Sequence, residues 1–437
     1  MLSLVPPHPL GFRARVALAL ALALALAACG GDAPAPRDVT TRPRPTSRPS
    51  VVLVNVSGAR HDAVVASNGA APLLPAFAAF AKDATWFDQA TAAATWETPS
   101  LSTALTGLIP FDTNMGGRAG DAHPYLIPSI PTLAEMLHEE GYATAAFVSG
   151  QNVAKPLGLD QGFDAWRDGL ASDAVPAAVE AWLAARTKDR PFFLFVHLDA
   201  TRPPPPEGTK DLSAWAGPAY EARIREADAA LARVTKALDA ASLPADTMTI
   251  LFSDHGEPRA IPPSGVLRGD DVTDDAVRVP LAVRAASWPK ARVTGSCGLV
   301  DLLPSVRDAM GLPPASGTGG RALRPLARAP TAPGAPVLVQ AWRRTATATG
   351  PQDATVFAVR TARAKFVAVF TARPPAWTET FYDLERDPGE RAPLSGDAAA
   401  SFGPEFERAV KNVRDLLQGR RKHFNDPVIV GYAAGGG

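Results

Sequence analysis

The chain has 437 residues and a formal net charge of zero, with 44 Lys and Arg balancing 44 Asp and Glu. A hydrophobic content of 46% excludes a wholly disordered chain, and the length suits one large α/β domain or two smaller ones. The balanced charge and the lack of a long basic run in the folded part argue against general nucleic-acid binding through a cationic face. Two cysteines, Cys29 and Cys297, are too few for a disulfide scaffold or a cysteine-based zinc site.

The first segment of the chain is typical of a targeting signal. Arginines precede an apolar run over 16–28, which is too short to span a bilayer comfortably. The run ends Leu-Ala-Ala-Cys at Cys29 and resembles the lipobox of bacterial lipoproteins. The resemblance implies a signal peptide over 1–28 and a lipid on Cys29. The lipid would anchor the protein to a bacterial membrane, facing the periplasm or the exterior, and Gly30 favours the outer membrane. An ordinary signal peptide or a short anchor is the alternative.

After a Pro-rich linker over 29–49, strand and helix patterns alternate. The run 51–56 is apolar and rich in β-branched residues, which predicts a buried parallel strand. The other predicted strands are 143–148, 191–197 and 248–252, and the predicted helices are 74–82, 131–140, 175–186 and 220–240. This alternation indicates a doubly wound sheet with helices on both faces.

From Val337 the pattern changes to short strand-like runs without intervening helices, at 337–341, 355–361, 365–370 and 380–384. These runs predict a small antiparallel sheet, with an amphipathic helix over 404–417 packed on it. We therefore predict an α/β domain at 50–330, a C-terminal subdomain at 336–421 and a tail at 422–437.

Polar clusters follow three of the predicted strands, at 57–62, 197–201 and 253–257. In open α/β sheets, ligands bind at the carboxyl ends of the strands. The three clusters therefore predict a shared site at that edge of the sheet.

These clusters, in this order, resemble the sulfatase family within the alkaline phosphatase superfamily. The most literal landmarks are Gly-Leu-Asp-Gln-Gly-Phe-Asp at 158–164, Ser-Asp-His-Gly-Glu at 253–257, Arg-Val-Pro-Leu at 278–281, Val-Asp-Leu-Leu-Pro at 300–304 and Phe-Tyr-Asp-Leu-Glu-Arg-Asp-Pro-Gly-Glu at 381–390. The resemblance covers about 50–415. It implies a mostly parallel central sheet flanked by helices, with a small C-terminal antiparallel sheet and helix.

The resemblance implies a divalent cation, usually Ca²⁺, that neutralises the sulfate and holds the nucleophile. The family pattern Asp-x-Leu-Arg-x-Asp matches 57–62, where Ser57 replaces the metal-binding Asp. Asp254 and His255 match a second pair of ligands. The implied metal site, for Ca²⁺ or another divalent cation, is therefore Ser57, Asp254 and His255, with Ser57 degenerate.

The family's nucleophile is a Cys or Ser that becomes formylglycine, followed by x-Pro-Ser and a basic residue. The matching residues run Glu-Thr-Pro-Ser-Leu, which places Glu97 at the nucleophile and Leu101 at the basic position. Glutamate cannot become formylglycine, so none is expected. Ser57, Thr98 and Ser100 are hydroxyls that would be available as replacements, although Ser100 is expected to cap the following helix.

Two substrate-binding positions also depart from the family pattern. Thr201 stands where the family often has His, and Arg268 stands where a His or Lys reaches the leaving-group oxygen. An arginine keeps the charge but is too basic to act as a general acid. We predict that Glu97 and Arg268 pair across the cleft. The competing arrangement is a cation held by Glu97, Asp254 and His255.

Several polar residues have a simpler structural interpretation. We expect His197 to be a hydrogen-bonded structural histidine. We expect His61 to lie in a surface loop; the alternative is that His61 is a substitute metal ligand beside Ser57. Asp62 is expected to be a helix cap or loop residue, and Cys297 an inert buried thiol.

The sequence thus predicts a sulfatase-like lipoprotein whose sulfatase chemistry is lost or much reduced. A second interpretation is a working hydrolase of sulfuric or phosphoric esters with a rearranged metal site. A third is a cell-surface scaffold or carbohydrate-binding protein. The partners implied are a sulfated or phosphorylated small molecule or glycan, and membrane lipid through Cys29.

Overall fold

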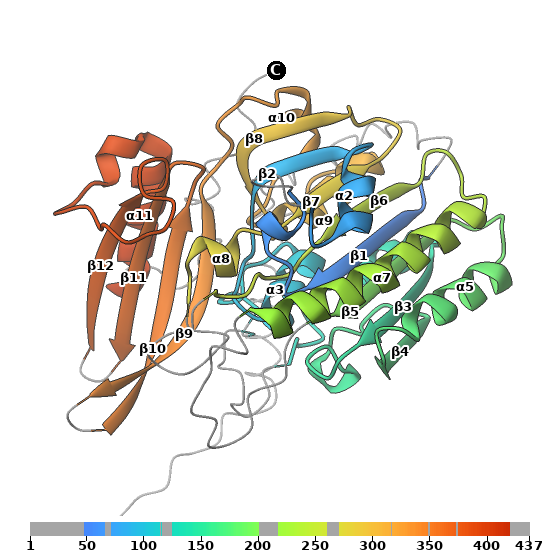
Figure 1. Cartoon of the computed structure of the whole chain (residues 1–437), viewed down its shortest axis with the longest axis horizontal. Coiled ribbons are helices and arrows are strands. Elements are labelled where there is room, and N and C mark those ends of the chain that lie inside the picture. Colours follow the sequence, from blue (N-terminus) through green and yellow to red (C-terminus); the bar gives the residue numbers. More distant parts are fainter. Residues whose placement is uncertain are drawn as a thin grey trace, which may run out of the picture. The chain divides into compact units, whose positions relative to one another are not determined.

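The computed structural model describes residues 48–65, 71–113, 115, 125–200, 217–259, 271–315, 317–347, 350–372 and 375–419. All of these described residues belong to one compact unit. It contains an eight-stranded sheet and a four-stranded sheet, with helices packed on both (Figure 1).

The large sheet has the strand order β4-β3-β5-β1-β6-β7-β2-β8. Its strands are β1 (Val51–Ser57), β2 (Thr85–Thr91), β3 (Ala143–Ser149), β4 (Ala165–Leu170), β5 (Phe192–Asp199), β6 (Met248–Phe252), β7 (Leu281–Arg284) and β8 (Ala291–Gly298). All its pairings are parallel except those of β7 with β6 and β2. β1 lies at the centre and is completely buried, as its β-branched run predicts.

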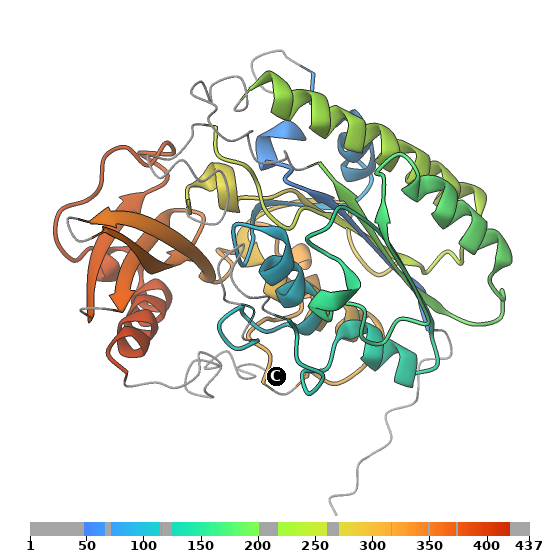
Figure 2. The same ribbon diagram turned by 90° about the horizontal axis from the view of Figure 1, so that it is seen from below.

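Helices cover both faces of this sheet (Figure 2). The helices α2 (Pro75–Ala81), α5 (Val175–Ala185) and α7 (Pro218–Ala240) pack on one face. The helices α3 (Glu97–Thr106), α4 (Leu133–Glu139), α9 (Leu302–Ala309) and α10 (Arg324–Arg328) pack on the other. Each face has its own hydrophobic core, so the sheet separates two apolar layers. This is the doubly wound arrangement that the sequence predicts.

The small sheet is antiparallel, with the order β12-β11-β10-β9. Its strands are β9 (Val337–Thr347), β10 (Gly350–Arg360), β11 (Ala364–Ala372) and β12 (Pro375–Asp383), and α11 (Pro404–Leu417) packs on one face. The other face packs against Val272, Ala276 and Val277 of the α/β region. Ala276 and Val277 belong to the short helix α8 (Asp274–Val277).

The fold class predicted from the sequence is confirmed, although four strands of the large sheet were not predicted. β2, β4, β7 and β8 lack the long apolar runs of the central strands. No helix within the described ranges is long and apolar enough to cross a membrane.

Candidate active site

Three segments meet at the carboxyl end of the sheet. Ser57 is the last residue of β1, and Asp254 and His255 follow β6, which pairs in parallel with β1. Glu97 is the first residue of α3. After Ser57 the chain turns sharply through Gly58, whose φ of +76° lies in the left-handed region that glycine tolerates best. The structure therefore brings together Ser57, Glu97, Asp254 and His255, which the sequence placed in one site.

Asp254 is hydrogen-bonded on every side by the protein. Its Oδ2 accepts a 3.0 Å hydrogen bond from Ser57 Oγ, and its Oδ1 accepts one of 3.0 Å from the His255 backbone N–H. Its own backbone N–H donates to Asn55 Oδ1 at 2.8 Å, and its carbonyl accepts from Ser100 Oγ at 2.5 Å. The carboxylate position is thus fixed by neighbouring strand and helix residues.

The contacts of the His255 ring define its tautomer. Nδ1 lies 2.6 Å from the Gly256 carbonyl, which only accepts, so Nδ1 carries a proton. Nε2 then faces Ser57 Oγ at 3.5 Å, Glu97 Oε2 at 3.8 Å and Asp254 Oδ1 at 3.9 Å. Glu97 therefore reaches an ion-pair distance from the imidazole.

The four side chains are closed off from solvent. Ser57, Asp254 and His255 are 0% exposed and Glu97 is 2% exposed. The Ser57 hydroxyl proton points to Asp254, so Ser57 is not presented to His255 as an activated nucleophile. The hydroxyls of Ser100 and Thr98 donate to backbone carbonyls, the latter to Asn152 at 2.5 Å. The hydroxyls of Ser57, Thr98 and Ser100, the three candidate replacement nucleophiles, therefore all donate hydrogen bonds to protein oxygens.

The donor set does not fit a hard divalent cation. Ca²⁺ takes six to eight oxygen ligands, several of them carboxylate. Ser57 contributes a hydroxyl that donates its proton to Asp254, and both Asp254 oxygens are already hydrogen-bonded. Across the described segments, no group of three or more His, Cys, Asp or Glu side chains is arranged to hold a metal ion. The described residues of this site therefore do not offer the ligand set that Ca²⁺ needs.

Three residues that the sequence analysis assigned a role lie outside the described residues: Cys29, Thr201 and Arg268. The predicted pairing of Glu97 with Arg268 lies outside the described residues with Arg268. Among the described residues, Glu97 Oε2 lies 3.8 Å from His255 Nε2.

Two structural interpretations were wrong. Ser100 does not cap the following helix, because it lies inside α3 and bonds the Asp254 carbonyl. His61 is not in an exposed loop: it is buried, its ring lies tilted against that of Trp86, and Nε2 lies 3.8 Å from Asp88 Oδ1. Burial lowers the pKa of His61, although Asp88 opposes the shift.

The remaining polar residues have structural contacts. His197 is buried and its Nδ1 lies 2.8 Å from Asn55 Nδ2. Asp62 lies in the 3-10 turn His61–Ala63 and contacts Arg60 and Arg259. Cys297 is a buried free thiol in β8, and burial raises its pKa.

Asn55 is the site residue that the sequence reasoning missed. It bonds both the Asp254 backbone and the His197 ring, and so ties β6 and β5 to β1. The available signal was an amide side chain inside an otherwise apolar buried strand, where a polar group needs a partner.

A family model described as Sulfatase matches residues 49–312, which is more than half of the chain. The chain belongs to the sulfatase family. This places it in the alkaline phosphatase superfamily, as its sequence motifs implied. Within the matched region, Leu101, which the motif match places at the family's basic position, is fully buried in the hydrophobic core.

A curated relative, an ulvan-active sulfatase of Formosa agariphila, is 26% identical over an alignment covering 53% of this chain and 56% of that protein. The chain thus spans about half the length of the curated relative that it matches. Among solved structures, one in complex with its substrate D-glucosamine-2-N,6-O-disulfate has a TM-score of 0.64 at 17% identity, covering 87% of this chain and 99% of that one. A phosphonate monoester hydrolase of Agrobacterium radiobacter has a TM-score of 0.63 at 19% identity, with coverages of 85% and 96%. These structures support the fold.

Proposed function

We propose that this sulfatase-family chain has lost formylglycine-dependent hydrolysis of sulfate esters. The observation that carries the proposal is Glu97, which begins α3 at the nucleophile position, 2% exposed and 3.8 Å from His255 Nε2. A glutamate has no route to formylglycine, and a buried carboxylate repels the anionic sulfate that a nucleophile must approach. Glu97 therefore opposes the attack on sulfur that formylglycine makes at this position in the family.

The surroundings of Glu97 support the same conclusion. Ser57 replaces a metal carboxylate and donates its proton to Asp254, while Leu101 replaces a cation and packs in the core. Three elements of the reaction, the nucleophile, the metal ligand and the orienting cation, are therefore substituted together. Replacing only one of them should not restore catalysis.

The variant Glu97→Cys tests this dependence. Expressed in a host that makes formylglycine, the variant should still not hydrolyse an aryl sulfate with Ca²⁺, and intact-protein mass spectrometry reads whether residue 97 has been modified. Turnover at an enzyme-like rate, about 1 per second or above, would mean that Glu97 is the only defect. It would also mean that the substitutions at Ser57 and Leu101 do not prevent hydrolysis of the sulfate ester.

A working hydrolase with a rearranged metal site is the alternative. It predicts turnover of an aryl sulfate or phosphate that a chelator abolishes. Among the described residues, no group of three or more His, Cys, Asp or Glu side chains is arranged to hold a metal ion, which argues against it. The likeness to a phosphonate monoester hydrolase concerns the fold.

For a ligand, we propose a sulfated carbohydrate bound without turnover. The proposal is supported by relatives described as an ulvan-active sulfatase and as a complex with a disulfated glucosamine. Isothermal titration with a sulfated oligosaccharide, against its desulfated form as control, tests this ligand class. Equal binding of both forms, or of neither, would refute it.

We also propose that Cys29 carries a lipid and anchors the protein to a bacterial membrane, facing the periplasm or the exterior. The support is the Leu-Ala-Ala-Cys motif after an apolar run. Cleavage at this cysteine would place the sulfatase-like region at the membrane surface through the Pro-rich linker.

A further inference from the structure

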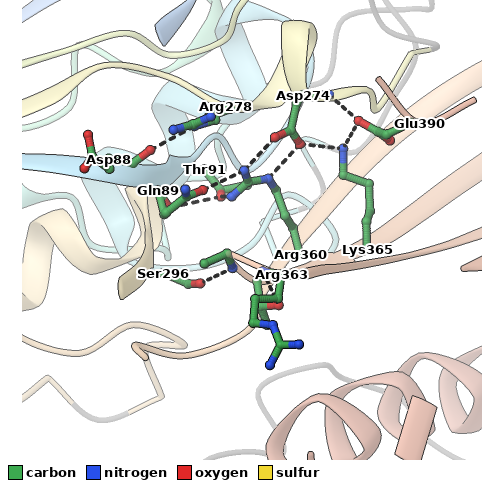
Figure 3. A network of polar contacts seen from close by, with 12 residues as sticks. Asp88, Gln89, Thr91, Asp274, Arg278, Ser296, Arg360, Arg363, Lys365 and Glu390 are labelled. Carbon is green, nitrogen blue, oxygen red and sulfur yellow. Dashed lines mark hydrogen bonds and ion pairs between the residues drawn. The ribbon is translucent and has the colours of Figure 1, made fainter. Parts of the chain in front are cut away.

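Two cationic side chains of the C-terminal sheet are fully buried and reach the same carboxylate of the α/β region (Figure 3). The Arg360 guanidinium, at the end of β10, donates to both Asp274 oxygens at 2.8 and 2.7 Å. The Lys365 ammonium, in β11, lies 2.8 Å from Asp274 Oδ1. The Arg360 and Lys365 side chains are 1% and 0% exposed. Because Asp274 is the first residue of α8, both strands are attached to the start of this helix.

Glu390, in the loop after β12, closes this network. Its Oε1 accepts from Lys365 Nζ at 2.7 Å and from the Asp274 backbone N–H at 2.7 Å. Glu390 has a φ of +53°, a left-handed conformation that is costly for a residue other than glycine and persists where surrounding contacts enforce it. Two cations and two carboxylates meet here, so the buried charges compensate one another.

The far end of the network also contacts the large sheet. Arg360 Nη1 lies 3.2 Å from Thr91 Oγ1, and its Nη2 donates to Gln89 Oε1 at 2.9 Å. These partners lie on β2, whose carboxyl end leads to Glu97. The guanidinium thus joins the C-terminal sheet to both α8 and β2.

The turn that carries Asp254 and His255 lies directly on α8. The Gly256 N–H donates to the Ala276 carbonyl at 2.8 Å. A Cβ atom at Gly256 would come within 2.1 Å of the Asp275 carbonyl oxygen, so only glycine allows this approach of two backbones. The turn is therefore anchored to α8 in addition to the β1 and α3 residues that hold Asp254.

The other two site segments are held by the same stretch of backbone. The Ala92 N–H, on the way from β2 to Glu97, donates to the Val277 carbonyl at 2.8 Å. The His61 N–H, which follows the Ser57 turn, donates to the Arg278 carbonyl at 3.3 Å. All three segments of the candidate site are thus hydrogen-bonded to 276–278.

We propose that Glu390 and Lys365 are positioning residues for the candidate site: by fixing the start of α8 they hold the turn with Asp254 and His255 in place. The C-terminal sheet is then a working part of the site and not an appended module. The inference concerns geometry, so it does not depend on whether the site binds a sulfated carbohydrate or has lost hydrolysis.

Hydrogen–deuterium exchange of the full chain, read by mass spectrometry, tests this role without a ligand. Glu390→Gln keeps the size of the side chain and removes its charge. We expect at least tenfold faster exchange in peptides covering 254–257 and 92–97, with β1 and β5 exchanging at the parent rate. Asp308→Asn is the matched control, because it weakens the Arg324–Asp308 pair elsewhere in the α/β region. It should leave 254–257 unchanged.

A merely structural role would give a different pattern. Faster exchange confined to 337–383, or an equal increase throughout the chain, would overturn the proposal. If Glu390→Gln does not fold, Glu390→Asp retains the charge on a shorter side chain and should give a smaller increase at the same peptides. Parent rates at 254–257 in the folded variant would also overturn the proposal.

Discussion

Ser57 Oγ donates a 3.0 Å hydrogen bond to Asp254 Oδ2 between two completely buried side chains. At this point a sulfatase-family metal site would set two carboxylates against a cation. Here the Ser57 hydroxyl donates its proton to the Asp254 carboxylate instead.

The variant Ser57→Asp tests this relationship. A second buried carboxylate beside Asp254 would be repelled, so we expect a lower melting temperature in the presence of a chelator. Added Ca²⁺ should raise the melting temperature of the variant, because an ion that binds only the folded state stabilises it. The melting temperature of the parent should change neither with the chelator nor with Ca²⁺. Ser57→Ala, the control, should cost about 1–2 kcal/mol through the lost hydrogen bond. A parent that loses stability on chelation would contradict this account.

Removing the charge of Glu97 should weaken the fold. Glu97 is 2% exposed and its Oε2 lies 3.8 Å from His255 Nε2. When His255 is protonated the two form a buried ion pair, and breaking one partner of such a pair costs about 3–5 kcal/mol. We therefore expect Glu97→Gln to lower the free energy of unfolding by about 3 kcal/mol, measured by urea denaturation. Glu385→Gln, which removes an exposed pair with Arg363, should cost less than about 1 kcal/mol. Equal losses in the two variants would rule out a specific role for Glu97.

Much of the large sheet is predictable from the sequence because its central strands are buried on both faces. β1, β3, β5 and β6 are therefore apolar runs. β2 contains buried polar residues such as Asp88, and β8 contains glycines, so their local sequences carry no strand signal. Their strand conformation comes from pairing partners distant in the chain.

The site is predictable only in part, for a related reason. Motif spacing finds Glu97, Asp254 and His255, which the structure brings together. The burial of His61 and the inward direction of Ser100 depend on contacts with Asp88 and with the Asp254 carbonyl, across long sequence separations. Local sequence patterns cannot contain such contacts.

The pH dependence of stability should report on Asp274. Burial opposes its charged form, but the cations Arg360 and Lys365 outweigh burial and hold its pKa well below the usual range. A depressed folded-state pKa stabilises the fold above the unfolded value, about 3.9, and the stabilisation is lost as the pH falls toward the folded value. The difference in unfolding free energy between the parent and Asp274→Asn should therefore be greatest near neutral pH and shrink below about pH 4. A difference that does not change with pH would contradict this assignment.

Cys29 should determine membrane attachment. We expect Cys29→Ala to remain unprocessed or to leave the detergent phase on Triton X-114 partitioning, because the lipid would be added to this thiol. The fold should be unaffected, as seen from an unchanged melting temperature. If the variant partitions and migrates like the parent protein, the lipid anchor is excluded.

Hydrolysis of an aryl sulfate by the purified full-length chain tests the central claim most directly. The assay should be run with Ca²⁺, with Mg²⁺ and with a chelator, beside an active sulfatase as positive control. Because the motif match places Glu97 at the nucleophile position, we expect product to form no faster than in the protein-free reaction under all three conditions. Turnover of about 1 per second or more by the parent chain would contradict the claim.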